Sequence, residues 1–481
     1  MKLRIKWKQA ILVFIALTVA FVALEAIAWL RPKPRLEVGR DTTWLSGPLD
    51  ANGNVDYDAA WRADRSAGVT SENNAAPLVY AVLGFELSTF TAEERSSAPK
   101  IDQPIQAFDE WAQSHGDQFA KPADPKGYSV DEALQALKSG DLHGQQERAL
   151  ATWFASIEPS LAVVQDAAGR ERFYAADGAP RSEQSKSYWT FVEIAKALAF
   201  RAHRRANSGD LDAACTDLCT LLRFARLVRS MGGYLHCLVG TSCESCLCEV
   251  FSSISTEHAP LPGAFVRRLF ESRDTSPLDQ TIDTWLASDR ISGLHVFEYL
   301  CQHDFEAFRV FSRLDPNRFN HRMSEWADRV AAAWTDSRGW AARLQAYDAL
   351  AREVKDLRLP HSVTPSVLFI LRGPAATADW LGDYFGSRRV IYTIHVKEFL
   401  EDFGNEDRLL VESSAAAFAK QFGRDPESSD ELTPFVFPTP FRDRLFGSAV
   451  SFRRDEKHAL VATGPLVEML ARIDDLRHPP K

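Results

Sequence analysis

The hydrophobic pattern from about residue 100 to residue 400 is that of a helical protein. Apolar residues recur there at three- and four-residue spacing, so that each segment presents one apolar face to a core. The segments that show this spacing are 104–115, 129–137, 148–165, 188–206, 281–300, 323–334 and 339–357. The sequence therefore predicts a body built from packed α-helices.

The clearest predicted pair of helices lies in the middle of this body. The first helix is expected to end at Gly209, and Asp210 is a suitable N-cap for the second. Ala214, Leu218 and Leu222 follow at four-residue spacing and predict the buried side of that second helix. Locally the turn resembles a tetratricopeptide hairpin. No second copy follows at the period of such repeats, so an extended array is not expected.

The pattern changes near the C-terminus. A predicted helix that ends at Gly423 is followed by a proline-containing turn and a short helical turn. Residues 448–454 and 458–464 then have the composition of two short strands joined as a hairpin. This end of the chain therefore predicts a small α+β tail.

The N-terminus contains a continuous apolar run. Residues 9–30 are long enough to cross a bilayer as a helix, and Trp7 and Trp29 stand at its two ends, where indole rings favour the interface. A cleaved signal peptide is the alternative, because Ala26 and Ala28 form a small-x-small cleavage pattern. The run is longer than a usual signal core, which favours a signal anchor over cleavage near Ala28.

Basic residues before this run favour a cytoplasmic N-terminus. The four positive charges of residues 1–8 slightly outnumber the three that follow the run within residues 31–35. The prediction is a single-pass membrane protein whose body lies on the outer side of the membrane. With signal cleavage the body would be secreted into the same compartment.

The predicted fold class is mainly α. It consists of an N-terminal transmembrane helix, an αα-hairpin body and a small α+β tail with a C-terminal β-hairpin. The predicted regions are an anchor at 1–36, a membrane-proximal helical region at 37–140, the helical hairpin body at 141–404 and the tail at 405–481.

Charge and composition exclude one class of partner. The net charge is −9 and the hydrophobic fraction is 45%, which is ordinary for a globular protein with a proper core. Proteins that bind nucleic acid need a basic face to displace counterions. No nucleic-acid partner is therefore expected.

An acidic segment near the N-terminus has two interpretations. Asp50, Asn52, Asn54 and Asp56 alternate like the start of a calcium loop, but Trp61 stands where such a loop needs a bidentate glutamate. A turn followed by a helix that Asp56 caps explains the same residues. The turn is the preferred interpretation.

A further helix is predicted after Asn74, where the apolar spacing is helical, and Thr70 and Ser71 are its N-cap candidates.

The cysteines gather in two neighbouring predicted helices. Cys243 and Cys246 share one face of a helix over 232–254, and an antiparallel arrangement places Cys219 beside them, with Cys215 one turn away. A thiolate metal site from these four residues is conceivable, although its spacing differs from that of zinc ribbons and knuckles. A structural disulfide is a second alternative. Buried thiols at a tight helix contact are preferred, since cysteine packs like a small apolar residue, so no metal and no cofactor are predicted.

The chain contains none of the common catalytic motifs. G-x-S-x-G, H-E-x-x-H, G-x-G-x-x-G and the P-loop are all missing. This favours a protein-binding or scaffolding module that holds a protein or peptide between helical hairpins, and leaves the catalytic residues unknown. The alternative is an enzyme or a redox or metal protein with an unrecognised site near the cysteine-rich helix.

Two motifs carry a resemblance to known proteins. Residues 55–57 read VDY and residues 68–76 read GVTSENNAA, shortly after the N-terminal apolar run. Together these two motifs resemble those of a large family of uncharacterised bacterial proteins that are anchored in the membrane by a single transmembrane helix. The tail is similar to that of pseudopilin-like secretion proteins, but has Asp425 where they usually have tyrosine. The resemblance implies architecture and membrane location, and it supplies no catalytic residues.

Overall fold

The computed structural model describes residues 37–101, 145–175, 185–231, 234–273, 315–336, 339–356, 377–385, 395–433 and much of 435–471, together with isolated positions elsewhere. The predicted membrane span at 9–30 lies outside these residues apart from isolated positions. The predicted helices at 104–115, 129–137 and 281–300 also lie outside the described residues, apart from isolated positions. These elements stay predictions.

The chain forms two compact units, each built from two separate segments of sequence. One unit contains residues 1–60 and 286–393, and the other contains residues 61–285 and 394–481. Both are mainly helical, which confirms the predicted fold class at that level.

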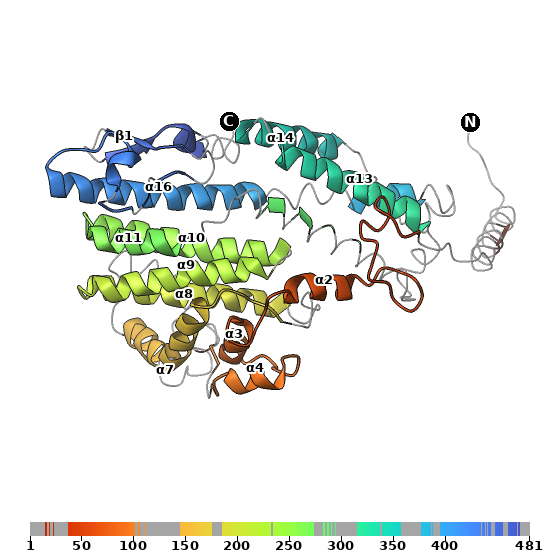
Figure 1. Ribbon diagram of the computed structural model, residues 1–481, viewed down its shortest axis with the longest axis horizontal. Helices are drawn as coiled ribbons and strands as arrows, with labels where there is room; N and C mark the ends of the chain where they lie inside the picture. Colours follow the sequence, from red (N-terminus) through yellow and green to blue (C-terminus); the bar gives the residue numbers. More distant parts are fainter. Residues whose placement is uncertain are drawn as a thin grey trace, which may run out of the picture. The chain divides into compact units, whose positions relative to one another are not determined.

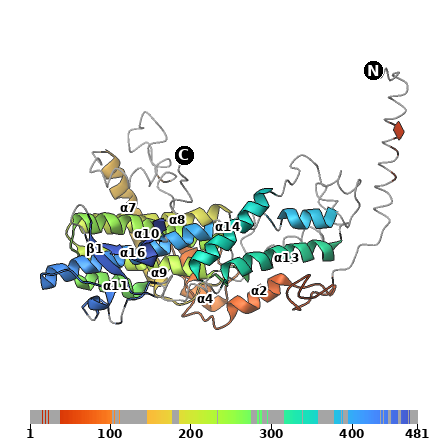
Figure 2. The same ribbon diagram turned by 90° about the horizontal axis from the view of Figure 1, so that it is seen from above.

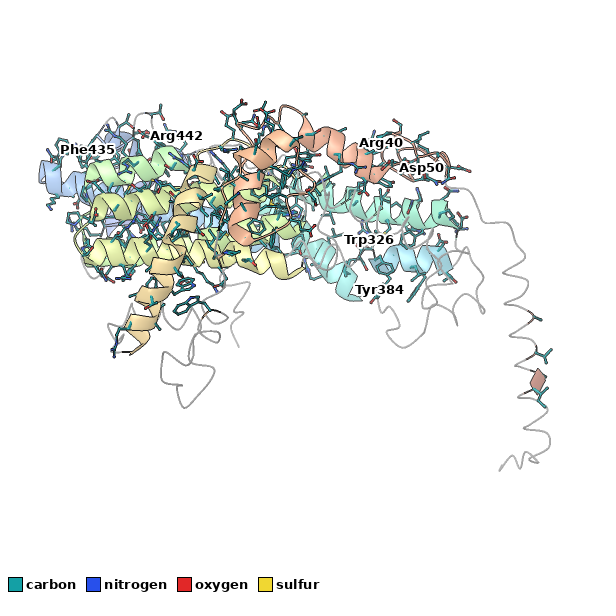
Figure 3. The ribbon with its side chains drawn as sticks, turned by 90° about the horizontal axis from the view of Figure 1, so that it is seen from below. Arg40, Asp50, Trp326, Tyr384, Phe435 and Arg442 are labelled. Carbon is teal, nitrogen blue, oxygen red and sulfur yellow. The ribbon has the colours of Figure 1, made fainter. Side chains whose placement is uncertain are left out.

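The first unit contains the helices α13 (Pro316–Trp334) and α14 (Trp340–Asp356), which pack against each other (Figure 1). Both were predicted from their apolar spacing. Asp315 begins α13 by accepting hydrogen bonds from two backbone N–H groups of its first turn. The indole N–H of Trp326 on α13 donates to Asp383 at 3.2 Å, and Tyr384 is the next residue in this helical stretch over residues 377–385 (Figure 3).

The second unit is a bundle around three long helices. They are α8 (Ser185–Asn207), α9 (Leu211–Ser230) and α10 (Tyr234–Glu257), and α16 (His395–Phe422) packs on the side of α10 (Figure 1). The shorter α11 (Gly263–Ser272) lies against α9 and α16.

The remaining helices of this unit flank the bundle. They are α3 (Ala76–Leu83), α4 (Ala92–Ser97) and α7 (Gln145–Ala168), and the division of the sequence after residue 60 falls within α2 (Tyr57–Ser66). α7 packs against both α3 and α9. It therefore links the N-terminal helices to the bundle.

The turn between α8 and α9 lies at Gly209 and Asp210, where the sequence predicts one helix to end and the next to begin. Gly209 has φ +85°, a left-handed conformation that favours glycine, and the Asp210 carboxylate accepts the N–H of Ala213 at 3.0 Å. Leu218 and Leu222, on the predicted inner side of α9, are both buried. Local signals alone thus fix this turn and the buried side of α9.

The start of α3 differs from expectation. The sequence suggested Thr70 or Ser71 as the N-cap, but the helix begins only at Ala76. Residues 70–73 instead form a turn in which the Asn73 side chain accepts the backbone N–H of Thr70 at 2.8 Å. Asx side chains bond to nearby backbone in this way, and such bonds compete with helix formation.

The tail has the predicted order of elements. Gly423, with φ +69°, ends α16, and the 3₁₀ turn η4 (Ser429–Leu432) follows. The strands β1 (Ser451–Arg454) and β2 (Leu460–Thr463) then pair antiparallel, with Phe452 opposite Ala462, and β2 packs on α16. Figure 2 shows β1 beside α16. Phe435 and Arg442 belong to the loop between η4 and β1 (Figure 3). The predicted α+β tail is confirmed.

Within the described residues, one helical stretch, His236–Glu257, is long and apolar enough to cross a membrane. Half of that stretch is buried inside the protein, which is what a core helix of a bundle also shows. This finding leaves the predicted N-terminal span untested.

Candidate functional site

A polar cleft of about 320 Å³ opens between α7, α9 and α11 in the second unit. Ligand-sized clefts in proteins start at about 300 Å³, so this one suits a small molecule or a single side chain. It is lined by Gln165, Ala168, Thr216, Cys219, Thr220, Arg223, Arg268, Glu271 and Ser272. Among the described residues, this cleft is the best candidate for a functional site.

The lining follows from helical spacing. Thr216, Cys219, Thr220 and Arg223 are separated by three, four and seven residues, which places them on one face of α9. Arg268, Glu271 and Ser272 repeat this spacing on α11. Because α9 and α11 pack together, two polar stripes meet and the cleft lies along their contact.

Hydroxyl groups orient the two arginines of the cleft. Arg268 Nη2 donates to Thr216 Oγ1 at 2.8 Å, and Arg223 Nη2 donates to Ser272 Oγ at 3.1 Å. A guanidinium group has five N–H donors, so each of these bonds uses only a small part of its capacity. The exposed Asp212 carboxylate lies 3.6 Å from Arg268 Nη1 and balances part of its charge.

Two thiols lie together where α9 meets α11. The Sγ atoms of Cys215 and Cys219 are 4.0 Å apart, one helical turn from each other on α9. Cys215 Sγ lies 3.5 Å from the Phe265 carbonyl oxygen, and Cys219 Sγ lies 3.6 Å from that of Arg268. The two thiols therefore join α9 to α11, and only Cys219 lines the cleft.

The surroundings give the two thiols different acidities. Donation from the Cys215 thiol lowers the pKa of Cys219, and the same interaction raises the pKa of Cys215. Burial opposes the effect at Cys219, whereas the Ser272 hydroxyl and the Arg268 and Arg223 guanidinium groups reinforce it. Cys219 is therefore the thiol that ionises more easily.

The cysteines of α10 have a different environment. Burial raises the pKa of Cys237 to about 11 and that of Cys243 well above its ordinary value. Cys243 Sγ lies 3.8 Å from the carbonyl oxygen of Phe191 on α8, and Cys246 is half-buried on α10. These thiols fill space between helices, and no disulfide joins any two of the six described cysteines.

The four candidate metal ligands do not form one cluster. Cys215 and Cys219 contact α11, whereas Cys243 contacts α8. In the described part of the chain, no group of three or more histidine, cysteine or acidic residues is placed to hold a metal ion. The sequence placed Cys219 beside the cysteines of α10, but in the structure its stripe of α9 faces α11.

The contact between α9 and α10 is made by other residues. Gly240 of α10 lies against Ala225 and Arg229 of α9, and the Arg229 guanidinium forms a buried ion pair with the Glu244 carboxylate. The predicted antiparallel packing of these helices is thus present. A charged pair in their contact was not foreseen, because a long arginine and a glutamate usually face solvent.

A serine, a histidine and a glutamate converge elsewhere in the bundle. His203 Nε2 lies 3.1 Å from Ser253 Oγ and 3.3 Å from Glu257 Oε1, and the serine hydroxyl donates to the same carboxylate at 2.7 Å. A catalytic triad needs the acid at Nδ1 of the histidine. Here Asn207 faces Nδ1 at 3.4 Å, so these residues join α8 to α10 and lack the geometry of a triad.

The acidic segment near the N-terminus forms a turn. Asp50 Oδ1 accepts the backbone N–H groups of Asn52 and Asn54, both at 2.8 Å, and Asp56 caps α2 by accepting the N–H of Ala59. These contacts correspond to the preferred interpretation from the sequence.

The sequence contains no local signal that singles out Arg223, Arg268 or Ser272. The polar stripe along α9 is visible in the sequence, but its partner stripe on α11 lies almost fifty residues further along the chain. Only the packing of α9 on α11 joins them into a cleft.

Comparisons with protein-family models, with curated proteins and with solved structures give no match for this chain. The resemblance to membrane-anchored bacterial proteins therefore stays a prediction.

Proposed function

We propose that this protein is a membrane-anchored binding protein whose helical body holds a protein or peptide partner outside the cytoplasm. The observation that carries the binding role is the pair of arginines, Arg223 and Arg268, which hydroxyl groups orient in a cleft of about 320 Å³. An acidic side chain of the partner is the group that this cleft suits.

The chemistry of the lining supports a carboxylate ligand. Guanidinium groups bind carboxylates through charge-assisted and often bidentate hydrogen bonds. The hydroxyls of Thr216 and Thr220 and the amide of Gln165 add neutral polar groups to the lining. The volume takes one side chain and leaves the rest of a peptide outside, so the partner would lie across the surface of α9 and α11.

The sequence supports the membrane location. The apolar run at 9–30 follows a basic N-terminus, whose four positive charges slightly outnumber the three that follow the run within residues 31–35. The hairpin of α8 and α9, with Gly209 and Asp210 at its turn, is locally similar to a tetratricopeptide hairpin, a unit that presents binding surfaces for peptides.

Binding can be tested with matched peptides. One set of fluorescent random peptides carries a single central glutamate, and the other carries glutamine at that position. We expect the full chain in detergent to bind the glutamate set more tightly. Arg223→Gln and Arg268→Gln should each weaken this binding by about tenfold or more, as for the loss of a charged hydrogen bond.

The exposed Arg204 of α8 provides the control. Arg204→Gln removes the same charge outside the cleft and should leave binding unchanged. Equal binding of both peptide sets, or an equal loss in all three variants, would overturn the proposed role of the cleft.

Location can be tested with reporters at both ends. A phosphatase that is active only outside the cytoplasm is fused after Lys481, and an epitope tag precedes Met1. We expect phosphatase activity and a tagged, full-length protein in the membrane fraction. If the phosphatase is active but the protein is soluble and has lost its tag, the predicted anchor is wrong and the segment is cleaved near Ala28. If the phosphatase is inactive, the predicted export is wrong.

A further inference from the structure

Cys219 combines three features that few cysteines share. It lines a cleft, it has a second thiol 4.0 Å away at Cys215, and two arginines line the same cleft. A thiol is nucleophilic as its thiolate, and neighbouring cations and hydrogen-bond donors stabilise the thiolate. Partner binding through the arginines does not require a cysteine at this position, so the thiol calls for an explanation of its own.

We propose that Cys219 is a modification site, where its thiolate forms a mixed disulfide with a small disulfide that carries carboxylates. The Cys219 sulfur attacks one sulfur of the small disulfide, and a new S–S bond forms as the original S–S bond breaks. Cys219 is oxidised, the second half of the small molecule is reduced, and it leaves as a thiolate that takes a proton from water. No further oxidant is needed.

The charges of the cleft favour an anionic reagent. Arg223 binds the neutral hydroxyl of Ser272 and so keeps its full positive charge. Arg268 is partly balanced by Asp212 at 3.6 Å, and Glu271 lines the same cleft. Two cations thus stand against the single acid of the lining, and carboxylates on the reagent can pair with the guanidinium groups.

Geometry favours a mixed disulfide over a bond between the two cysteines. Residues four apart on a helix have Cβ atoms about 5–6 Å apart, whereas a disulfide needs roughly 3.5–4.5 Å. A bond between Cys215 and Cys219 would therefore distort α9. A small molecule in the cleft meets no such constraint, and Cys215, which is 1% exposed, lies beneath the lining.

The role of Cys215 is then to support its neighbour. Its thiol lies within donating distance of the Cys219 sulfur and can stabilise the thiolate. Because Cys215 is also held near the Phe265 carbonyl at 3.5 Å, its position is fixed by α11. Cys215 acts as a positioning residue in this proposal.

The test uses the purified, reduced full chain and two probes of opposite charge. Oxidised glutathione carries carboxylates, and cystamine carries only amines. After brief exposure at pH 7 the thiols are blocked, the chain is digested, and mass spectrometry quantifies the modification of each cysteine. We expect Cys219 to gain a glutathionyl group before any cysteine of α10, and about tenfold faster than it reacts with cystamine, as charge steering would give.

Variants of the cleft sharpen the test. Arg223→Gln and Arg268→Gln should reduce the preference for the anionic probe, while Arg204→Gln should preserve it. In Cys215→Ala, the half-maximal pH for labelling of Cys219 should move upward, because the hydrogen-bond donor near the thiolate is removed. A rate equal for both probes, a disulfide between Cys215 and Cys219, or faster modification of Cys237 would overturn the proposal.

This inference does not depend on the identity of a partner, and its outcome is separable from that of the peptide test. Labelling reports on the thiol in the absence of peptide. If the chain does not prefer the glutamate peptides but Cys219 is still labelled as expected, only the proposed function is overturned. If the chain prefers the glutamate peptides but Cys219 is not labelled as expected, only the proposed modification site is overturned.

Discussion

The Asp217 carboxylate accepts hydrogen bonds from two N–H groups along one edge of the Arg201 guanidinium. Arg201 Nε lies 3.1 Å from Oδ2 and Nη2 lies 2.7 Å from Oδ1, so the pair is bidentate. Arg205 adds a third bond at 2.9 Å, and Glu158 of α7 accepts from Arg201 at 2.8 Å. The Asp217 side chain is fully buried, and this network ties α7, α8 and α9 together next to the cleft.

Removing the carboxylate from this network should be costly. Asp217→Ala leaves the buried Arg201 guanidinium without its bidentate partner, and we expect a loss of about 3–5 kcal/mol in the free energy of unfolding. Asp212→Asn, on the fully exposed side of the same helix, should change it by less than about 0.5 kcal/mol. Urea unfolding of the full chain, followed by circular dichroism, measures both.

The double variant Arg201→Met with Asp217→Leu tests the reason for that loss. It removes both charges and keeps apolar volume, so it should recover much of the stability lost in Asp217→Ala. If the double variant is less stable than Asp217→Ala, an uncompensated buried charge is not the cause.

Gly240 allows the close contact between α9 and α10. A Cβ at this position would lie 2.3 Å from Arg229 Cγ and 3.0 Å from the Ala225 carbonyl oxygen. Arg229 is paired with Glu244 and 4% exposed, so its side chain cannot simply move aside. Gly240→Ala should therefore destabilise by about 1–3 kcal/mol, although alanine is the better helix former.

Gly263 offers a matched control in the same unit. A Cβ there would meet only the ring of Phe435, with Cζ nearest at 3.4 Å, an ordinary contact. Gly263→Ala should leave the thermal midpoint within about two degrees of the wild type, while Gly240→Ala lowers it by several degrees. Equal effects of the two substitutions would contradict the steric explanation.

Asn74, within the GVTSENNAA segment, joins that segment to the residues that follow α7. Its amide nitrogen donates to Glu94 Oε1 at 2.8 Å and to the Tyr174 carbonyl at 2.9 Å, while its oxygen accepts the N–H groups of Ala76 and Tyr174. The residue is fully buried. Its side chain therefore needs both a donor and an acceptor, which asparagine provides.

Asn74→Asp should destabilise the chain at neutral pH by about 2 kcal/mol or more, because a second carboxylate then faces Glu94 and the Tyr174 carbonyl loses its donor. Glu94→Gln in the same background should restore part of this loss. A double-mutant cycle measured by thermal unfolding gives the coupling, and a coupling near zero would show that Glu94 is not the source.

The sequence predicted the elements whose signals are local. The helix ends predicted at Gly209 and Gly423 were correct. The residue that closes each helix has a left-handed backbone conformation, which favours glycine, so a glycine after an apolar periodic segment is a reliable local signal. The strands of the tail were correct because two short β-rich segments flank a charged turn. The start of α3 was wrong because Asn73 and Arg170 hold a turn there, and Arg170, which donates to the Ser71 carbonyl, is about one hundred residues away.

The candidate site was predicted only in part. Cys215 and Cys219 were recognised as close neighbours, since four-residue spacing on a helix guarantees that contact. Their partners on α11 were missed. Helical spacing shows on which face of its own helix a residue lies, but it does not show which other helix packs against that face. The buried pair of Arg229 and Glu244 was missed for a related reason: the pattern treats charged residues as exposed, and only the structure shows that they pair.

Glu412 makes the stability of the tail depend on pH. It lies on α16 and accepts the backbone N–H of Ala462 in β2 at 2.9 Å. Burial raises the pKa of Glu412, the bond from Ala462 and the charge of Arg408 oppose this, and Asp455 adds to it. A carboxyl group with a raised pKa in the folded state stabilises it fully below the unfolded pKa of about 4.3. This contribution is lost as the pH rises through the folded pKa.

Glu412→Gln keeps an oxygen that can accept from Ala462 and removes the charge. The free energy of unfolding of this variant, relative to that of the wild type, should therefore increase between pH 4 and pH 8. Glu427→Gln, at an exposed position of the same unit, should show no such trend. Urea unfolding at several pH values measures the difference, and a relative stability that falls with pH would mean that the ionised carboxylate is favoured in the folded tail.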